Sequence, residues 1–505
     1  MNYFSKILSG TVVLLALGTN FGCNSKSLDI PPPTPAESNY FSNENEYKTA
    51  IFGVYALLSD YYSSSNIPGG SGSTEMETFF LPGADITTSA QEAYELFGNR
   101  MNSTEGKLAQ VFGSSYVLCN RANKVIASFA NVKDGVFQTP GLENWNKGEV
   151  YFLRGFAHYM LWNLFGTAPL DTANVVSASQ FNPPSSQGTE LLDQAISDFT
   201  TAASLLPASW DAADLGRVTA NSAYGMLGKS LVFRATVNKD AADYQAALTA
   251  FSKISGVSLV ANFEDNFDWE QENNAESLFE YQSGSNINGF TNGWLSNDAA
   301  DVGVASGFWQ CYGGGQTYVG GGLWIATDKL ASAFDPADPR LPLTLNTSNN
   351  NITKYVLKGK PESVVNDLDN YRILRYADVL LLEAEATIQS GGSASAAIGF
   401  INQVRARARS MVGGGTVPAD LNTAETDPAT IMQWIMDERL RELGGEGQNW
   451  FDIRRWALGG QITLDNDYFS SVNPTQMSWD NHYLFFPIPS SEKDKNPNIV
   501  QNPGY

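Results

Sequence analysis

The fold is decided by residues 371–409, which read YRILRYADVLLLEAEATIQSGGSASAAIGFINQVRARAR. Apolar side chains in its first half recur at helical spacing, whereas Asp378, Glu383 and Glu385 fall mostly on the opposite face. The apolar stripe consists of Ile373, Ala377, Leu380, Leu381, Ala384 and Ile388. This pattern predicts an amphipathic helix that opens with Arg372–Val379.

A second helix is expected directly after the first. Gly391 and Gly392 interrupt the pattern, and either Ser393 or Ser395 can cap a new helix. The apolar stripe then resumes at Ala397, Phe400, Ile401, Val404 and Ala408. Two antiparallel helices joined by a short turn cannot bury both of their faces, so this hairpin needs neighbours.

Further helical stripes elsewhere in the chain supply those neighbours. They are Val150, Leu153, Ala157, Met160, Leu161 and Leu164; Leu192, Ala195, Ile196, Phe199, Ala203 and Leu206; Ala220, Ala223, Tyr224, Leu227, Leu231 and Ala235; and Tyr244, Ala247, Leu248, Phe251 and Ile254. A helix is also expected within 40–62, and a helical region within 92–131 that is interrupted near Gly98 and Gly113. The helix pairs have the size of tetratricopeptide (TPR) repeats, but their spacing is irregular. A TPR-like scaffold is favoured over an ordinary helical bundle without repeat ancestry.

Residues 261–370 have a different character. The 39 residues from Gly284 to Gly322 hold 11 of the 45 glycines, a density that neither a helix nor a regular strand would use. Large rings lie in or just after this stretch, at Phe290, Trp294, Phe308, Trp309, Tyr312, Tyr318 and Trp324. Flexible backbone that carries large rings indicates a recognition loop, and the alternative is a loop whose rings pin it to the scaffold.

The N-terminus has the pattern of an exported lipoprotein. Residues 1–22 hold Lys6 and an apolar run from Ile7 to Leu17 that is too short to span a bilayer. Gly22 followed by Cys23 suits a lipoprotein signal peptidase, although Asn20 stands where a leucine is usual. We therefore expect a signal peptide at 1–22, lipidation of Cys23 and a tether at 23–39. The alternative is an ordinary signal peptide with a buried cysteine.

Composition limits the classes of partner. The formal charge is −22, which disfavours nucleic acid, anionic lipid surfaces and polyanionic ligands. The 11 Trp, 21 Tyr and 28 Phe are more than packing alone requires, so some rings should be exposed for binding. Cys119 and Cys311 can pair in an oxidising compartment, but a buried free thiol is favoured for Cys119 because its neighbours are apolar.

Residues that could carry out catalysis or bind metal are sparse. Of the two histidines, His158 is expected to be a packed helix residue, and His482 lies near the tail. An acidic stretch is interpreted as a solvated loop, with a calcium site as the alternative; it holds Glu264, Asp265, Asp268, Glu270 and Glu272. The mixed charges of residues 437–456 favour structural ion pairs. No GxSxG, HExxH or P-loop sequence occurs, although a catalytic carboxylate pair would leave no such mark.

Several segments together resemble the SusD/RagB family of outer-membrane nutrient-binding lipoproteins. They are the lipidation site at Cys23, residues 154–157 and 164–170, the segments 372–379, 384–386 and 401–405, the run 438–455 and the close 486–505. They follow one another in order over nearly the whole mature chain.

The resemblance implies a mainly α fold with four TPR-like helix pairs and a loop-rich ligand-binding face that carries short strands. It also implies an outer-membrane, cell-surface location and a SusC-like TonB-dependent transporter as partner. Family members bind glycan through aromatic rings, so the candidates are Trp294, Trp309, Tyr312 and Trp324, with Tyr94 and Asp85 from an earlier loop as further candidates. A neutral glucan is favoured as ligand, and no cofactor is expected.

Three functions compete at this point. The first is a non-catalytic glycan-binding lipoprotein that delivers its ligand to the transporter; the second is a peptide-binding relative with the same fold and partner; the third is a glycoside hydrolase that uses two of the 53 carboxylates. The sequence favours the first, with one domain over 40–505. Its scaffold is expected mainly within 40–260 and 371–460, and its ligand region at about 261–370.

Overall fold

A computed structural model describes residues 40–62, 86–88, 102–175, 177–282, 324–355, 370–411, 415–470 and 479–505. Within these ranges the chain is mainly α-helical, as the sequence predicts, and its named strands form two antiparallel pairs, β1–β3 and β2–β4. The longer helices are α2 (Glu44–Tyr55), α6 (Gly106–Ser128), α7 (Leu142–Phe165), α8 (Glu190–Leu205), α9 (Ala220–Asn238), α10 (Ala241–Phe251), α13 (Tyr376–Gln389), α14 (Ala394–Ser410), α15 (Pro428–Leu443) and α16 (Asn449–Leu458). No helix in the described ranges has the length and apolar character needed to cross a bilayer.

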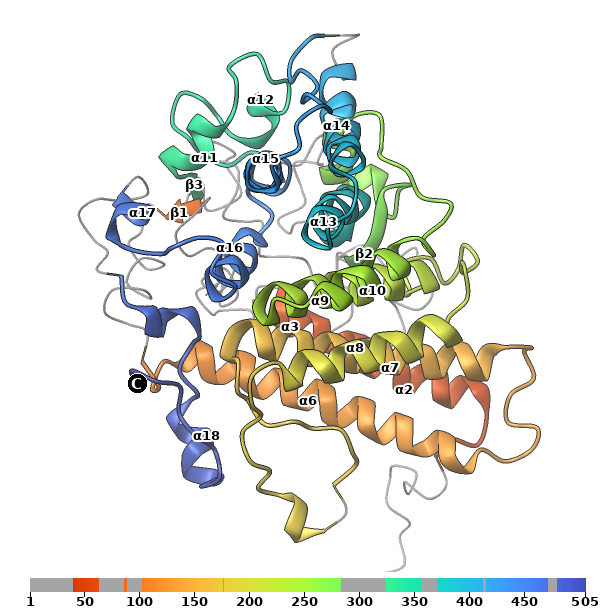
Figure 1. Cartoon of the computed structure of the whole chain (residues 1–505). Helices are drawn as coiled ribbons and strands as arrows, with labels where there is room; N and C mark the ends of the chain where they lie inside the picture. Colours follow the sequence, from red (N-terminus) through yellow and green to blue (C-terminus); the bar gives the residue numbers. More distant parts are fainter. Residues whose placement is uncertain are drawn as a thin grey trace, which may run out of the picture.

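The helices stack in pairs. In the described part of the chain the pairs are α2 with α6, α7 with α8, α9 with α10, and α13 with α14. In Figure 1 the first two pairs form the lower part of the molecule, α9 and α10 the middle, and α13 to α15 the upper part. This arrangement confirms the predicted helix-pair scaffold.

Small residues set how closely these helices approach. A side chain at Gly155 of α7 would press on Asp198 and the backbone of Ala195 in α8. A side chain at Gly228 of α9 would overlap the ring of Phe251 in α10. Helix α7 is buried over most of its circumference. One apolar core takes residues from Tyr47 to Ile499, and a second, formed mainly by α13, α14 and α15, contains Leu380, Ile401 and Ile435.

The turn between α13 and α14 follows the expected chemistry. Gly391 has φ +75°, a left-handed conformation that glycine adopts without strain. The side chain of Ser393 then accepts a hydrogen bond from the backbone N–H of Ala396 at 3.3 Å. Ser393, and not Ser395, is therefore the N-cap of α14.

The predicted start of the central helix is wrong. Residues Tyr371–Arg375 form β4, which pairs with β2 (Ser277–Tyr281), and α13 begins at Tyr376. All five residues of β4 are buried, so no polar face alternates with an apolar one to reveal the strand. Asp378 and Glu385 are also buried instead of facing away, since both form ion pairs inside the protein.

Two smaller expectations also differ from the structure. Helix α6 continues through Gly113 without interruption, because a single glycine lowers helix stability without ending a long helix. The sequence of residues 483–505, with its prolines, also predicts an extended tail, but this tail contains the short helix α18 (Ser490–Lys495). Cys119 is a buried free thiol, as favoured, while Cys311 lies outside the described residues.

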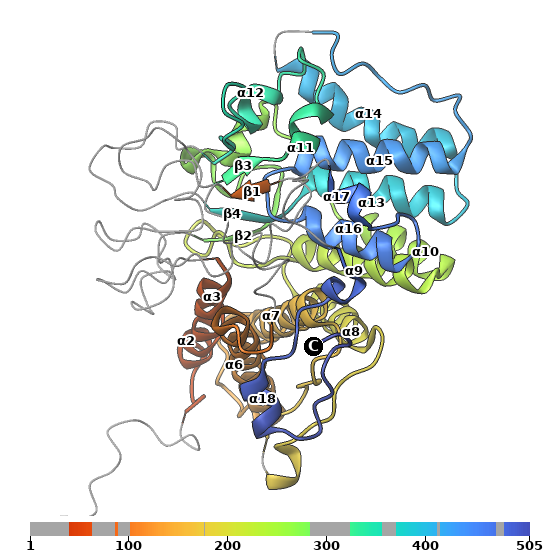
Figure 2. The same ribbon diagram turned by 90° about the vertical axis from the view of Figure 1, so that its left-hand side faces the viewer.

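The strands occupy one side of the molecule. Figure 2 shows β1 (Ile86–Thr88), β3 (Trp324–Ala326), β2 and β4 together on the left, with α13 to α16 above them or to their right and α2, α6 and α7 below. The short helices α3 (Ser59–Tyr62), α11 (Asp328–Ala333), α12 (Leu341–Thr344) and α17 (Asn466–Ser470) complete the described elements.

Candidate functional site

The β1–β3 ribbon joins the two parts of the chain that the sequence selects for ligand binding. Its register pairs Ile86 with Ala326, Thr87 with Ile325 and Thr88 with Trp324. Because the strands are antiparallel, the chain leaves toward residue 89 and returns from residue 323 at the same end of the ribbon. Asp85 immediately precedes β1, and Trp324 is the first residue of β3.

The second ribbon, β2–β4, is surrounded by tyrosines. The ring of Tyr62, at the end of α3, stacks on Tyr371 at 4.6 Å between centroids and lies 5.8 Å from Tyr281. Tyr355 lies 6.5 Å from Tyr371, and the four rings are buried. These four tyrosines, which are far apart in the sequence, therefore lie together beside β2 and β4. We call the two ribbons with Tyr62, Tyr281, Tyr355 and Tyr371 the strand face.

The structure describes only part of the predicted site. Trp324 lies in β3, opposite Thr88. The other candidates, Trp294, Trp309, Tyr312, Tyr94 and Asp85, and the lipidation candidate Cys23, lie outside the described residues. What the structure brings together is the strand that begins at Trp324 and the strand that follows Asp85.

A buried charge network fixes β4 and the segment 324–355 to the helices. The guanidinium of Arg375 donates to Glu276, Glu442 and Glu446 at 2.8, 2.6 and 2.8 Å. Arg340 of the 324–355 segment reaches Glu438 and Glu442 of α15 at 2.7 and 2.9 Å. Burial would raise the pKa of the Glu442 carboxyl, but the surrounding arginines outweigh it and hold that pKa well below its usual range. We call this set of residues the Glu442 network.

The same network holds Lys354. Its ammonium group donates to Glu446 at 2.7 Å and to the carbonyl oxygens of Glu442 and Gly444 at 2.8 Å each. Burial lowers the pKa of Lys354 to about 8, against the attraction of Glu446. Charge-assisted hydrogen bonds thereby attach the segment that carries β3 to the end of α15, in addition to the buried apolar side chains of Leu330 and Ile352.

A second network joins α9, α13, α15 and α16. Asp378 accepts from Lys229 at 2.7 Å and from Arg439 at 2.8 Å, and Arg439 also reaches Asp452 at 2.7 Å. Asp452 also pairs with Arg455, which in turn pairs with Glu385 of α13. Burial would raise the pKa of Asp378, but the two cations lower it to about 2. The predicted structural role of the charges at 437–456 is confirmed.

The buried His158 and Cys119 are not placed for chemistry on a ligand. Their Nε2 and Sγ atoms lie 4.0 Å apart, and both side chains are sealed from solvent. Burial lowers the pKa of His158 to about 3, with the Arg154 charge adding to the effect, so the imidazole stays neutral. Burial likewise raises the pKa of the Cys119 thiol well above its usual range. His158 is the packed helix residue that the sequence predicts.

The acidic stretch at 264–272 makes local contacts. Asp268 accepts from the backbone N–H of Glu270 at 3.0 Å, and Glu272 accepts from that of Asn370 at 2.9 Å. Across the described ranges, no group of three or more His, Cys, Asp or Glu side chains is arranged to hold a metal ion. Glu264 and Asp265 lie in the 3-10 helix Phe263–Phe267, and Glu270 lies in the 3-10 helix Trp269–Gln271, so the stretch is more ordered than the predicted solvated loop.

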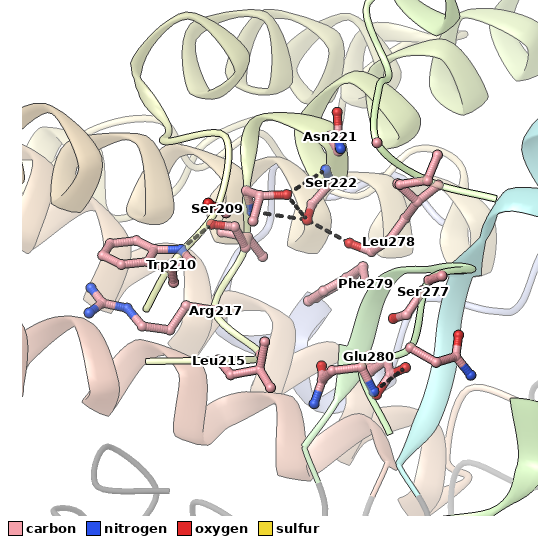
Figure 3. Close-up of a pocket in the computed structure, with 18 of the residues that line it drawn as sticks. Ser209, Trp210, Leu215, Arg217, Asn221, Ser222, Ser277, Leu278, Phe279 and Glu280 are labelled. Carbon is pink, nitrogen blue, oxygen red and sulfur yellow. Dashed lines mark hydrogen bonds between the residues drawn. The ribbon is translucent and has the colours of Figure 1, made fainter. Parts of the chain in front are cut away.

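Two hollows that the sequence did not reveal adjoin the loop between α8 and α9. One, of about 210 Å³, lies between Trp210 and Arg217 on one side and β2 on the other (Figure 3). On its inner wall the hydroxyl of Ser222 donates to the carbonyl of Leu278 at 2.5 Å. The other hollow, of about 430 Å³, is lined by Trp145 and Trp210 together with the start of α2. A tryptophan in a polar loop, as in residues 207–217, is the one sequence signal that could have indicated them.

Comparison with known proteins decides the family. Residues 336–505 match the SusD family model, and residues 41–231 match a second model described as "Starch-binding associating with outer membrane". The chain belongs to the SusD/RagB family. Members of this family bind starch or other glycans and associate with the outer membrane.

Individual relatives extend the match along the chain. SusD-like protein P2 of Formosa agariphila is 25% identical, with 98% of this chain and 99% of that protein aligned. A SusD superfamily protein from Bacteroides vulgatus shares the fold with a TM-score of 0.70 and 24% identity, over 92% of this chain and 100% of that one. Surface glycan-binding protein A from Bacteroides thetaiotaomicron, solved with laminarihexaose, has a TM-score of 0.69 and 19% identity, over 91% of this chain and 99% of that one.

Proposed function

We propose that this SusD/RagB protein captures a neutral oligo- or polysaccharide at its strand face and does not cleave it. The observation that carries the proposal is the pairing of Thr88 with Trp324. That pairing brings the segment after Asp85 and the end of the ring-rich segment to neighbouring positions on one ribbon. Residues far apart in sequence can therefore contribute to one site.

The chemistry of the candidate residues fits a sugar. The CH groups of a pyranose ring stack on indole and phenol rings, a role that we assign to Trp294, Trp309, Tyr312 and Trp324. Sugar hydroxyls donate to carboxylates and exchange hydrogen bonds with phenols, a role that we assign to Asp85 and Tyr94. None of these contacts requires a charged ligand, which agrees with a net charge of −22.

The pairing of the carboxylates beside the strand face supports capture over catalysis. The carboxylates of Glu276, Glu442 and Glu446 beside β4 are buried and occupied by Arg375 and its neighbours. A glycoside hydrolase needs an accessible pair of carboxyl groups that flank the bond to be cleaved. These three carboxylates instead hold the ribbons in place.

The domain layout follows the same proposal. Residues 1–22 direct export, Cys23 carries the lipid, and residues 23–39 tether a single domain over 40–505 to the outer membrane. The larger apolar core takes residues from both ends of this domain, from Tyr47 to Ile499, which supports one domain instead of several. A SusC-like TonB-dependent transporter would receive the glycan from the strand face.

A glycan array probed with the soluble Cys23→Ser protein tests the ligand class. We expect binding to neutral glucans, and laminarihexaose and maltohexaose are the first probes. Incubation with the same oligosaccharides should leave their lengths unchanged, which chromatography would show. Binding to peptides but to no glycan would favour the peptide-binding alternative, and shortened products would show a hydrolase.

Cell fractionation tests the anchor. The wild-type protein should sediment with outer membranes and carry a lipid on Cys23, whereas the Cys23→Ser variant should be released. Retention of that variant in the membrane fraction would count against lipidation at this residue.

A further inference from the structure

The larger hollow beside the α8–α9 loop has a wall made of two indole rings. The centroids of Trp145 and Trp210 lie 5.5 Å apart with their planes at 82°. The hollow of about 430 Å³ lies between these rings and the first turns of α2. Volumes of about 300–1,000 Å³ are typical of small-molecule sites. A site of this size accommodates one or two sugar rings.

Trp210 is held in a fixed orientation. Its indole N–H donates to the carbonyl of Val218 at 2.8 Å, and the guanidinium of Arg217 lies 3.8 Å from its ring centroid. Arg217 is itself buried and forms an ion pair with Glu149 at 2.6 Å. The ring is therefore positioned before any ligand arrives, which lowers the entropic cost of binding.

The charged groups that line the hollow already have partners, either other charged side chains or backbone N–H groups. Asp214 accepts from Lys48 at 2.9 Å and from Arg217 at 3.1 Å. The Glu44 carboxylate accepts from the backbone N–H groups of Gln138 and Thr139 at 2.9 and 3.0 Å. Neither an anion nor a cation is required to complete this wall.

Neutral polar groups remain available. Among the described residues, the side-chain amide of Asn45, the hydroxyl of Ser209 and the indole N–H of Trp145 have no hydrogen-bond partner, and all three residues line the hollow. Two rings together with uncharged donors and acceptors match the faces and hydroxyls of a pyranose. An apolar ligand would leave these polar groups unsatisfied, and a phosphate would meet the carboxylates of Asp211 and Asp214.

We propose that this hollow is a second carbohydrate site, which binds a terminal or branch pyranose of a neutral glycan. It is built from α2, the start of α7 and residues 209–217, and it uses no residue of the strand face. The inference rests on the proposed function only for the class of ligand. A second, weak contact to the same polysaccharide would raise the overall avidity without tightening the first site.

Fluorine NMR tests the proposal on the Cys23→Ser protein labelled with 5-fluorotryptophan. The Trp145→Phe and Trp210→Phe variants assign the two resonances. Laminarihexaose, maltohexaose and xylohexaose are each added to about 10 mM, above the millimolar dissociation constant expected of a weak sugar site. We expect both resonances to shift saturably with at least one of these sugars, while that of Trp434, which does not line the hollow, stays in place.

Two further variants separate this site from the strand face. Asn45→Ala, at an exposed position of α2, should raise the dissociation constant obtained from the saturable shift by about 3- to 10-fold, as expected for one lost hydrogen bond. The double variant Trp294→Ala and Trp309→Ala should leave the shift intact even if it abolishes binding at the strand face. Resonances of Trp145 and Trp210 that move with none of the three sugars, or a shift that Asn45→Ala leaves unaltered, would overturn the second site.

Discussion

The two ends of the helix stack differ in how they bury charge. Around α7, apolar side chains and edge-to-face rings, such as Phe152 against Phe199 at 5.2 Å, surround separate buried ion pairs, Arg154 with Asp198 and Arg217 with Glu149. Around β4, α13 and α15, an apolar cluster lies beside the connected ion pairs of the Glu442 network and of Asp378. The strand face is attached to this second region. The difference indicates that apolar burial makes the scaffold at both ends, whereas connected ion pairs set the position of the ribbons.

Removal of a central cation of the Glu442 network should lower the free energy of unfolding more than any other change considered. Arg375→Met leaves the carboxylates of Glu276, Glu442 and Glu446 with one cation fewer in a buried site. We expect the free energy of unfolding, measured by urea denaturation, to fall by about 3–5 kcal/mol. The control is Lys495→Met, whose ion pair with Glu492 is exposed, and a loss of at most about 1 kcal/mol is expected there. Equal losses of unfolding free energy in the two variants would show that the buried network stabilises the protein no more than an exposed ion pair does.

A cavity in the apolar region should lower the free energy of unfolding by nearly as much, but this loss should not depend on pH. Leu153 of α7 is fully buried. Leu153→Ala should lower the free energy of unfolding by about 2–5 kcal/mol, since it removes apolar contacts and leaves a void. The loss should be the same at pH 4 and pH 7 because no titrating group is changed. A loss that varies strongly with pH would show that charges also control this end of the stack.

Asp378 should make a smaller contribution to the free energy of unfolding, and this contribution should be lost in acid. Because its pKa is lowered from 3.8 to about 2 in the folded state, the stabilisation is complete above pH 4 and is lost as the pH falls toward 2. The shift corresponds to roughly 2 kcal/mol. The difference in free energy of unfolding between wild type and Asp378→Asn should therefore shrink over that range. A difference that stays constant would exclude the ion pairs with Lys229 and Arg439 as its source.

Glu383, on the same helix, should affect stability with the opposite pH dependence, and its effect should be the smallest of the four. Burial raises its pKa from 4.5 to about 7 in the folded state, so stability falls as the pH rises between these two values. Glu383→Gln should consequently melt about 2–4 °C higher than wild type at pH 8 and at the same temperature at pH 4. A variant that is equally destabilised at both pH values would show that the carboxylate makes a stabilising contact.

The sequence predicted the helices well because their stripes are long and apolar. Leu380, Leu381 and Ala384 in α13 lie in the core, as their spacing requires. It failed where charge is buried. The sequence places Arg372 and Arg375 at the start of the central helix, yet both are buried residues of β4 and pair with Glu280 and Glu442, which lie far away in the sequence. No local pattern announces such partners.

The candidate site was predictable only as a region. Ring and glycine density indicate a recognition segment, but Thr88 and Trp324 pair across a wide separation in the sequence, and no local signature predicts that pairing. Trp145 and Trp210 were also missed, because each is a lone ring in its own segment and only the fold brings the two together.

Isothermal titration calorimetry with laminarihexaose and maltohexaose tests the central claim most directly. The soluble Cys23→Ser protein is compared with the same protein carrying Trp294→Ala or Trp309→Ala. The account predicts that at least one variant keeps its melting temperature and loses about 1–3 kcal/mol of binding free energy, as expected for an exposed aromatic anchor. Unchanged affinity in both variants, for an oligosaccharide that the wild-type protein binds, would contradict it.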